Sequence, residues 1–215
     1  MLMSLKCLNV KMIAVSYIIF LIGWSLWNLC FDLSNFNEFS RWAIGLIVHI
    51  VWWPLFALTL MKRYDGQLMI SFREMVLTKP KLSILIPLMV FAVVYNLVVY
   101  FFANIGFGTD MKMYDLIITV LTVGIFEESV FRGWFLNALA PFTGVFKANL
   151  ISSVLFVFVH YPSWILHEYS TKLMISRSMM IFILSMIFGW TFIKSKSIWT
   201  GAIFHSCWDL ISFMI

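Results

Sequence analysis

Charged residues are scarce in this chain of 215 residues: lysine, arginine, aspartate and glutamate together make up only 12%. A soluble domain of this length carries about twice that fraction, so the composition excludes an ordinary soluble protein. Hydrophobic residues make up 62%, and the mean hydropathy is +0.96. The sequence therefore predicts a single integral membrane domain over residues 1–215.

Cysteines and clusters of basic residues are also rare. The three cysteines, Cys7, Cys30 and Cys207, have no Cys-x-x-Cys spacing, and their odd number argues against a closed disulfide framework. The net charge is +5, but no basic run is interleaved with polar residues, so no nucleic-acid partner is expected. The positive charge instead suits the cytoplasmic loops of a membrane protein.

Long apolar segments make up most of the chain. A membrane-crossing helix needs about 20 mostly apolar residues, and about seven segments qualify, which predicts an all-α, polytopic bundle of transmembrane helices. The first segment is too long to be the apolar part of a cleavable signal, so we expect it to be retained. The predicted spans are residues 11–31, 42–61, 82–103, 115–140, 148–166, 178–194 and 197–215.

Basic residues indicate the orientation. With the N-terminus in the cytoplasm, the inner segments hold ten lysines and arginines and the outer segments hold four, which is the bias found in membrane proteins. We therefore expect a multi-pass protein of the cell membrane with a cytoplasmic N-terminus and a C-terminus outside. Within the longest inner loop, residues 70–77 form either a short amphipathic helix on the inner surface or a solvated charged stretch.

A few ionisable residues lie inside the predicted spans. A charge at mid-helix costs about 2.5–3.5 kcal/mol in a bilayer, so these residues are candidates for a structural or a chemical role. They are His49 in the second span, Glu127, Glu128 and Arg132 in the fourth, His160 in the fifth, and His205 and Asp209 in the seventh, and of these His49 has no motif around it.

Helix geometry separates the acidic residues. Glu128 and Arg132 are four residues apart, so they share a face and can form an ion pair. Glu127 is rotated by about 100° from Glu128 and has no local partner. His205 and Asp209 are also four residues apart, so Asp209 can orient the imidazole or hydrogen-bond a ligand beside it.

A carboxylate and two imidazoles are expected at similar depths in the membrane. At 1.5 Å per residue from the expected helix starts, Glu127 and His160 lie roughly 18 Å along their helices and His205 roughly 12 Å, in an apolar core about 30 Å thick. Such a set suits peptide hydrolysis, with a glutamate as general base and histidines for proton transfer and oxyanion stabilisation. Histidine and glutamate are also good zinc ligands, but His-Glu-x-x-His is absent. No cofactor is predicted, and metal ligation stays open as the alternative.

Three motifs, taken in order, resemble those of a known family. Glu127-Glu128-x-x-x-Arg132, Phe156-x-x-x-His160 and His205-x-x-x-Asp209 are similar to the motifs of the CPBP family, the CAAX proteases and bacteriocin-processing enzymes, also called Abi. This family includes the type II CAAX prenyl endopeptidases, and the chain resembles its small bacterial members. The resemblance covers about residues 115–215, and the N-terminal helices carry no motif.

The resemblance implies an intramembrane endopeptidase that hydrolyses peptide bonds in a membrane peptide or protein substrate. By resemblance, Glu127 activates water, His160 assists it, and His205 with Asp209 forms the oxyanion-binding side. The third motif of the family often ends in asparagine, and Asp209 as an anion would repel an oxyanion unless it is protonated. The implied site consists of the catalytic residues Glu127, Glu128, His160 and His205 and the supporting residues Arg132 and Asp209.

Several functions remain compatible with this sequence. Small bacterial family members are associated with bacteriocin immunity and with peptide or protein maturation. A non-catalytic immunity or scaffold protein that binds a peptide or receptor would keep the charged residues for folding alone. A small transporter would use the carboxylates as a proton relay, but the chain lacks repeat symmetry and paired Gly- or Pro-broken helices.

Overall fold

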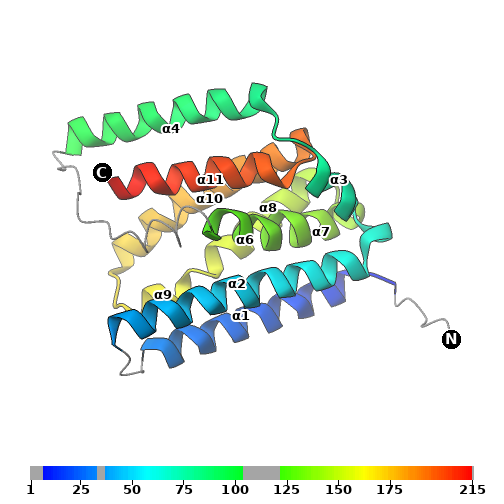
Figure 1. Ribbon diagram of the computed structural model, residues 1–215, viewed down its shortest axis with the longest axis horizontal. Coiled ribbons are helices and arrows are strands. Elements are labelled where there is room, and N and C mark those ends of the chain that lie inside the picture. Colours follow the sequence, from blue (N-terminus) through cyan, green and yellow to red (C-terminus); the bar gives the residue numbers. More distant parts are fainter. Residues whose placement is uncertain (1–6, 33–36, 104–121, 215) are drawn as a thin grey trace.

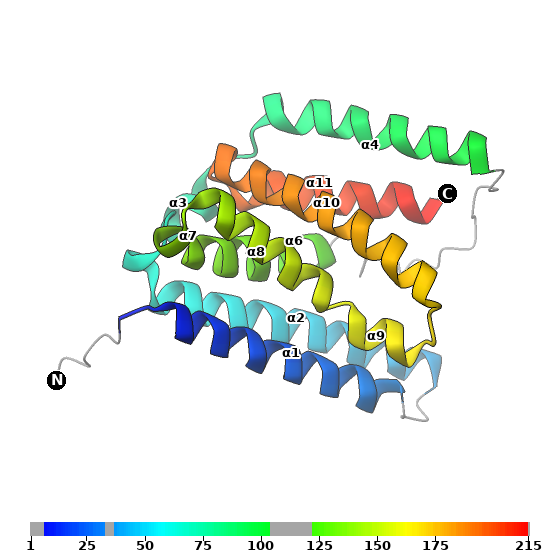
Figure 2. The ribbon, with the colours of Figure 1, turned by 180° about the vertical axis from the view of Figure 1, so that it is seen from behind.

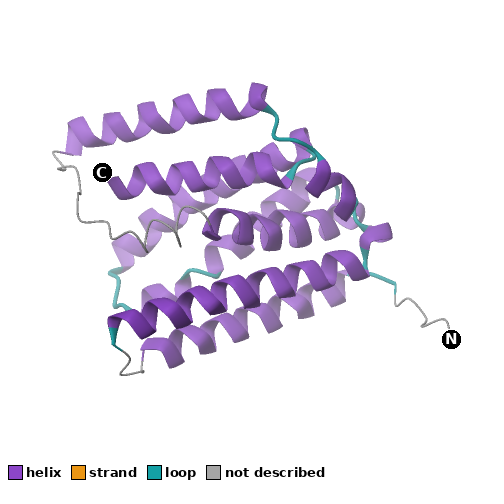
Figure 3. Ribbon diagram, in the orientation of Figure 1, coloured by secondary structure: helices purple, strands orange, loops and turns teal. Residues whose placement is uncertain are grey.

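The described residues of the computed structural model, 7–32, 37–103 and 122–214, form a helical bundle without strands (Figures 1 and 3). This confirms the predicted all-α class. The first half contributes α1 (Val10–Asp32), α2 (Glu38–Arg63), the 3-10 turn η1 (Asp65–Gln67), α3 (Phe72–Leu77) and α4 (Leu82–Ala103). The second half contributes α6 (Gly124–Glu128), the π-helical segment η3 (Ser129–Leu136), α7 (Asn137–Thr143), α8 (Val145–Phe158), α9 (Tyr161–Leu166), α10 (Thr171–Ser195) and α11 (Ile198–Met214).

Five helical segments in the described part of the chain are long and apolar enough to cross a membrane. They correspond to five of the seven predicted spans. The predicted seventh span is α11, which is shorter at 17 residues, and the predicted fourth span begins at Asp115, outside the described residues. A count of seven crossings therefore stays a prediction. The five segments are Val10–Phe31, Ala43–Arg63, Leu82–Phe102, Val145–Leu166 and Thr171–Ser195.

The short segments α6, η3 and α7 run through the middle of the bundle (Figures 1 and 2). Helices α1 and α2 lie along one side of them, and α10, α11 and the outermost helix α4 lie along the other. The aromatic side chains of η3 are fully buried: Phe131 packs against Phe20 of α1 and Trp53 of α2. By contrast, α4 exposes large apolar side chains such as Phe101, as expected of a helix in contact with lipid.

The predicted fifth span is not one continuous helix. Helix α8 ends at Phe158 and α9 begins at Tyr161, with a turn at Val159 and His160 between them. Pro162 lies in the first turn of α9, where its missing N–H is not needed, but its ring does not fit a helix that continues through this point. His160 is therefore the N-cap residue of α9 and not a mid-helix residue.

The helix at the predicted sixth span, α10, is longer than the predicted range 178–194. The Ser170 hydroxyl accepts a hydrogen bond from the Leu173 N–H and caps α10, which begins at Thr171. Arg177, which the sequence placed in an outer segment before this span, therefore lies within the helix. A tight hairpin joins α10 to α11, with Lys196 in the left-handed conformation at φ 57°.

The inner-loop segment 70–77 contains a short helix, α3. Ile70 and Met75 are buried in the core. The alternative of a solvated charged stretch is therefore wrong for the face of the segment that carries these two residues. The Asn137 side chain accepts a hydrogen bond from the Ile70 N–H and donates one to its carbonyl oxygen, each at 2.8 Å. Trp199 donates to the Val76 carbonyl oxygen at 2.7 Å. These contacts hold α3 against both η3–α7 and the start of α11.

Candidate active site

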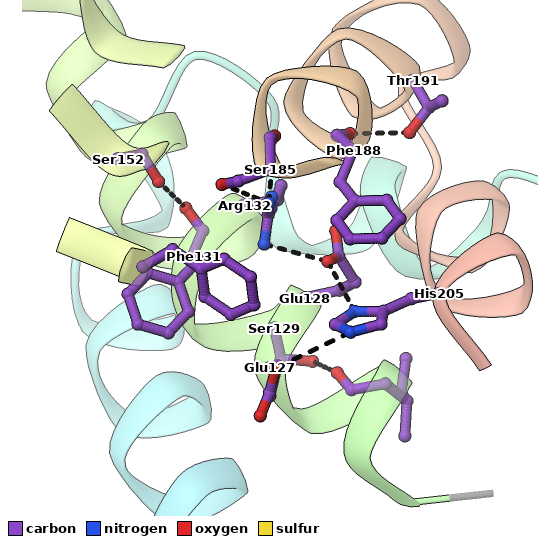
Figure 4. A network of polar contacts seen from close by, with 12 residues as sticks. Glu127, Glu128, Ser129, Phe131, Arg132, Ser152, Ser185, Phe188, Thr191 and His205 are labelled. Atoms are coloured by element: carbon purple, nitrogen blue, oxygen red, sulfur yellow. Dashed lines mark hydrogen bonds and ion pairs between the residues drawn. The ribbon is translucent and has the colours of Figure 1, made fainter. Parts of the chain in front are cut away.

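The ion pair expected between Glu128 and Arg132 is present and fully buried. The Arg132 Nη1 atom lies 2.9 Å from the Glu128 Oε1 atom. Arg132 also donates from Nη2 to the carbonyl oxygen and the hydroxyl of Ser185 on α10, at 3.0 and 2.7 Å. Its guanidinium lies between the rings of Phe156 and Phe188, 4.8 and 5.1 Å from their centroids. Arg132 thus connects the central segment to α8 and α10 (Figure 4).

Three carboxylates surround the His205 side chain of α11. Its Nδ1 atom lies 3.1 Å from Glu128 Oε1, and its Nε2 atom lies 3.7 Å from both Glu127 Oε2 and Asp209 Oδ2. The ring stacks on Phe188, with centroids 4.4 Å apart and planes 19° apart. Both ring nitrogens therefore face acceptors, and the stacking fixes the orientation of the ring.

The two neighbouring glutamates differ in their access to water. Glu128 has no exposed side-chain surface, whereas 13% of the Glu127 side chain is exposed. Glu128 is occupied by Arg132 and His205, and Glu127 borders an open cavity. Only Glu127 is therefore placed to meet a water molecule or a substrate.

The His160 side chain is oriented by its own helix. Its Nδ1 atom lies 2.8 Å from the carbonyl oxygen of Phe156, one helical turn earlier. A carbonyl oxygen can only accept, so Nδ1 carries the proton, and Nε2 can accept a proton when the ring is neutral. The ring lies edge-on to Phe156 and close to Trp164 of α9. The helix break at this residue thus presents an oriented imidazole.

The candidate residues converge on one cavity of about 310 Å³. Glu127, His160, His205 and Asp209, which come from α6, the α8–α9 turn and α11, all line it. Apolar and aromatic side chains of α8, α10 and α11 form most of its remaining wall. Glu128 and Arg132 lie behind it and hold His205 in place.

The donor set does not fit a metal centre. Within residues 7–32, 37–103 and 122–214, no three side chains of His, Cys, Asp or Glu are arranged to hold a metal ion. His205 directs one nitrogen at a glutamate that Arg132 already neutralises.

Residues 109–211 match the family model described as type II CAAX prenyl endopeptidase Rce1-like. This match supports the CPBP family of intramembrane CAAX proteases for this chain. The matched segment contains all three polar motifs, which confirms the resemblance inferred from them. Together with the five apolar helical segments, the match identifies a multi-pass membrane protein. The chain matches no curated protein and no solved structure.

Sequence reasoning missed two contacts of this CPBP site. It considered only Asp209 as a residue that could orient His205, whereas Glu128 lies closer, and it found no role for Ser185. Glu128 and His205 are 77 residues apart, so no local spacing predicts their contact. The contact between His160 and the Phe156 carbonyl could have been expected, because residues four apart on a helix lie on one face.

Gly124 allows the CPBP glutamates to approach His205. A Cβ atom at this position would lie 2.8 Å from the Ala202 carbonyl oxygen and 3.1 Å from the Ser206 N atom, both in the backbone of α11. Backbone atoms cannot rotate away, so Gly124→Ala is expected to push α6 from α11 and to destabilise the fold by about 1–3 kcal/mol. Thermal unfolding of the purified protein measures this effect. Gly66→Ala is the matched control, because a Cβ atom added there would meet no other part of the protein within 4 Å. Equal unfolding temperatures of the two variants would contradict the prediction.

Proposed function

We propose that this CPBP protein is an intramembrane endopeptidase that hydrolyses peptide bonds with a water molecule activated by Glu127. The observation that carries the proposal is the contrast between the two glutamates: Glu128 is enclosed by Arg132 and His205, while Glu127 borders the cavity. A carboxylate in such a position can take a proton from water as the water attacks a peptide carbonyl carbon.

His205 would stabilise the negative charge that forms on the carbonyl oxygen. Its Nε2 atom borders the cavity, and the Glu128 carboxylate at Nδ1 fixes the orientation of the ring. Because Nδ1 donates to this carboxylate, donation from Nε2 requires the ring to carry both protons. Asp209 lies 3.7 Å from Nε2, where it helps to keep a proton on this nitrogen. The aromatic walls at Phe156 and Phe188 keep the ring from rotating.

His160 would assist with the proton. Its Nε2 atom accepts when the ring is neutral, because Nδ1 donates to the Phe156 carbonyl oxygen. It can therefore help to orient the attacking water together with Glu127. The proton taken by Glu127 then passes to the amine of the leaving peptide, so that one water molecule is consumed for each bond broken and no acyl-enzyme forms. The substrate would be a membrane peptide or protein. Its cleavage would serve bacteriocin immunity or the maturation of a peptide or protein.

Peptide cleavage by the purified protein tests this function. The full chain is reconstituted in lipid vesicles and incubated with a mixed library of apolar peptides, and mass spectrometry identifies the new peptide ends. We expect cleavage that continues in the presence of a metal chelator and gives no hydroxamate when hydroxylamine is added. A trapped hydroxamate would indicate a covalent acyl intermediate and would contradict direct attack by water.

A further inference from the structure

A single cation borders the cavity that holds the proposed catalytic residues. Arg177 of α10 lines it together with Glu127 and His160, and it is the one lysine or arginine among the described lining residues. Arg177 also lines a second cavity of about 340 Å³. The two cavities share Arg177, Met180, Ile181, Trp208 and Asp209, so they form one continuous passage between α10 and α11.

Aromatic rings hold Arg177 in position at this passage. Its guanidinium lies 4.8 Å from the centroid of the Tyr169 ring. Tyr169 stacks on Trp164, with planes 11° apart, and Trp164 lies beside His160 with centroids 5.6 Å apart. Stacking occupies the face of a guanidinium and leaves its N–H donors free at the edge. The row of rings therefore links the position of Arg177 to that of the proposed catalytic histidine.

Arg177 forms no ion pair with an acidic residue in the described part of the chain. This holds even for Asp209, which lines the same two cavities. The carboxylates of Glu127 and Asp209 would repel a negatively charged ligand, so such a ligand needs a cation to enter. A guanidinium with free edge donors matches a carboxylate, which it can bind with two parallel hydrogen bonds.

We propose that Arg177 is a specificity-determining residue that binds a carboxylate of the substrate peptide near the scissile bond. The carboxylate belongs either to an acidic side chain or to a free C-terminus. The proposal rests on the proposed peptidase function, since it assigns a substrate feature to the same cavity.

Peptide capture by an inactive protein tests the proposal without relying on cleavage. Full-length Glu127→Gln protein in lipid nanodiscs is incubated with short apolar peptides in matched pairs, and mass spectrometry quantifies the retained peptides. One pair differs by a C-terminal carboxylate or amide, and the other by an aspartate or asparagine side chain. We expect the carboxylate member of one pair to be retained about tenfold better, as a charge-assisted hydrogen bond provides, and the pair concerned identifies the source of the carboxylate.

Second-site variants in this background assign the preference to Arg177. Arg177→Gln should remove it and Arg177→Lys should keep part of it. Lys172→Gln, which removes an exposed cation from the same helix away from both cavities, should leave it unchanged. Equal retention within both pairs, or a preference that survives Arg177→Gln, overturns the proposal. The proposal is also overturned if Arg177→Gln changes the amount of anionic phospholipid that co-purifies but leaves peptide retention unchanged. The wild-type cleavage assay is a separate test. Cleavage without a carboxylate preference in the capture assay contradicts the role of Arg177 and leaves the peptidase function standing. A carboxylate preference without cleavage contradicts only the peptidase function.

Discussion

Replacing Glu127 by glutamine is expected to lower the rate of peptide cleavage by about 10²–10⁴-fold, the usual contribution of a general base. Glutamine keeps the shape of the side chain but cannot take a proton from water. The folded protein should persist, because Glu127 borders a cavity and the ion pair of Glu128 with Arg132 is untouched. The measurement is the single-turnover cleavage rate in lipid vesicles, with membrane level and unfolding temperature determined in parallel.

Glu74→Gln is the control for this substitution. Glu74 is partly exposed and pairs with Lys196 at 3.1 Å, away from the cavity, so its change should leave cleavage as it is. A Glu127→Gln protein that is stable and fully active would show that water activation by Glu127 is wrong. Another group that lines the cavity would then have to activate the water.

The second large effect is expected from Arg132→Ala, which should prevent accumulation of folded protein in the membrane. The substitution leaves the buried Glu128 carboxylate without its cation and removes two hydrogen bonds to Ser185. Removing one member of a buried ion pair costs about 3–5 kcal/mol, a large part of the stability of a typical domain. Membrane level and unfolding temperature measure the loss. Lys62→Ala, which removes an exposed cation at the end of α2, should have little effect.

A double variant separates folding from function at this pair. Replacing both charges, as in Glu128→Leu with Arg132→Met, removes the unpaired carboxylate, and such replacements are often neutral or stabilising. We expect the folded protein to return while cleavage stays lost, because His205 no longer has an acceptor at Nδ1. Recovery of both folding and cleavage would show that Glu128 and Arg132 serve only the fold.

Much of the architecture follows from local patterns. Four apolar segments correspond to long helices and a fifth to α8 with α9, and the Leu82–Ala103 helix has the predicted bounds. The Glu128–Arg132 pair was predictable because residues four apart share a face of a helix. The order of the three motifs was enough to indicate the family that the match over residues 109–211 supports. These features depend on neighbours in the chain, and a single sequence records such neighbours directly.

Only the tertiary structure decided how the polar residues divide their tasks. Glu128, and not Asp209 alone, holds His205, because α6 approaches α11 closely at Gly124. The break between α8 and α9 presents His160, and the early start of α10 brings Arg177 to the cavity. Apolarity and spacing determined which segments are helices and which residues share a face. The meeting of side chains from α6, α8, α10 and α11 depends on how whole helices pack, and no local spacing encodes that packing.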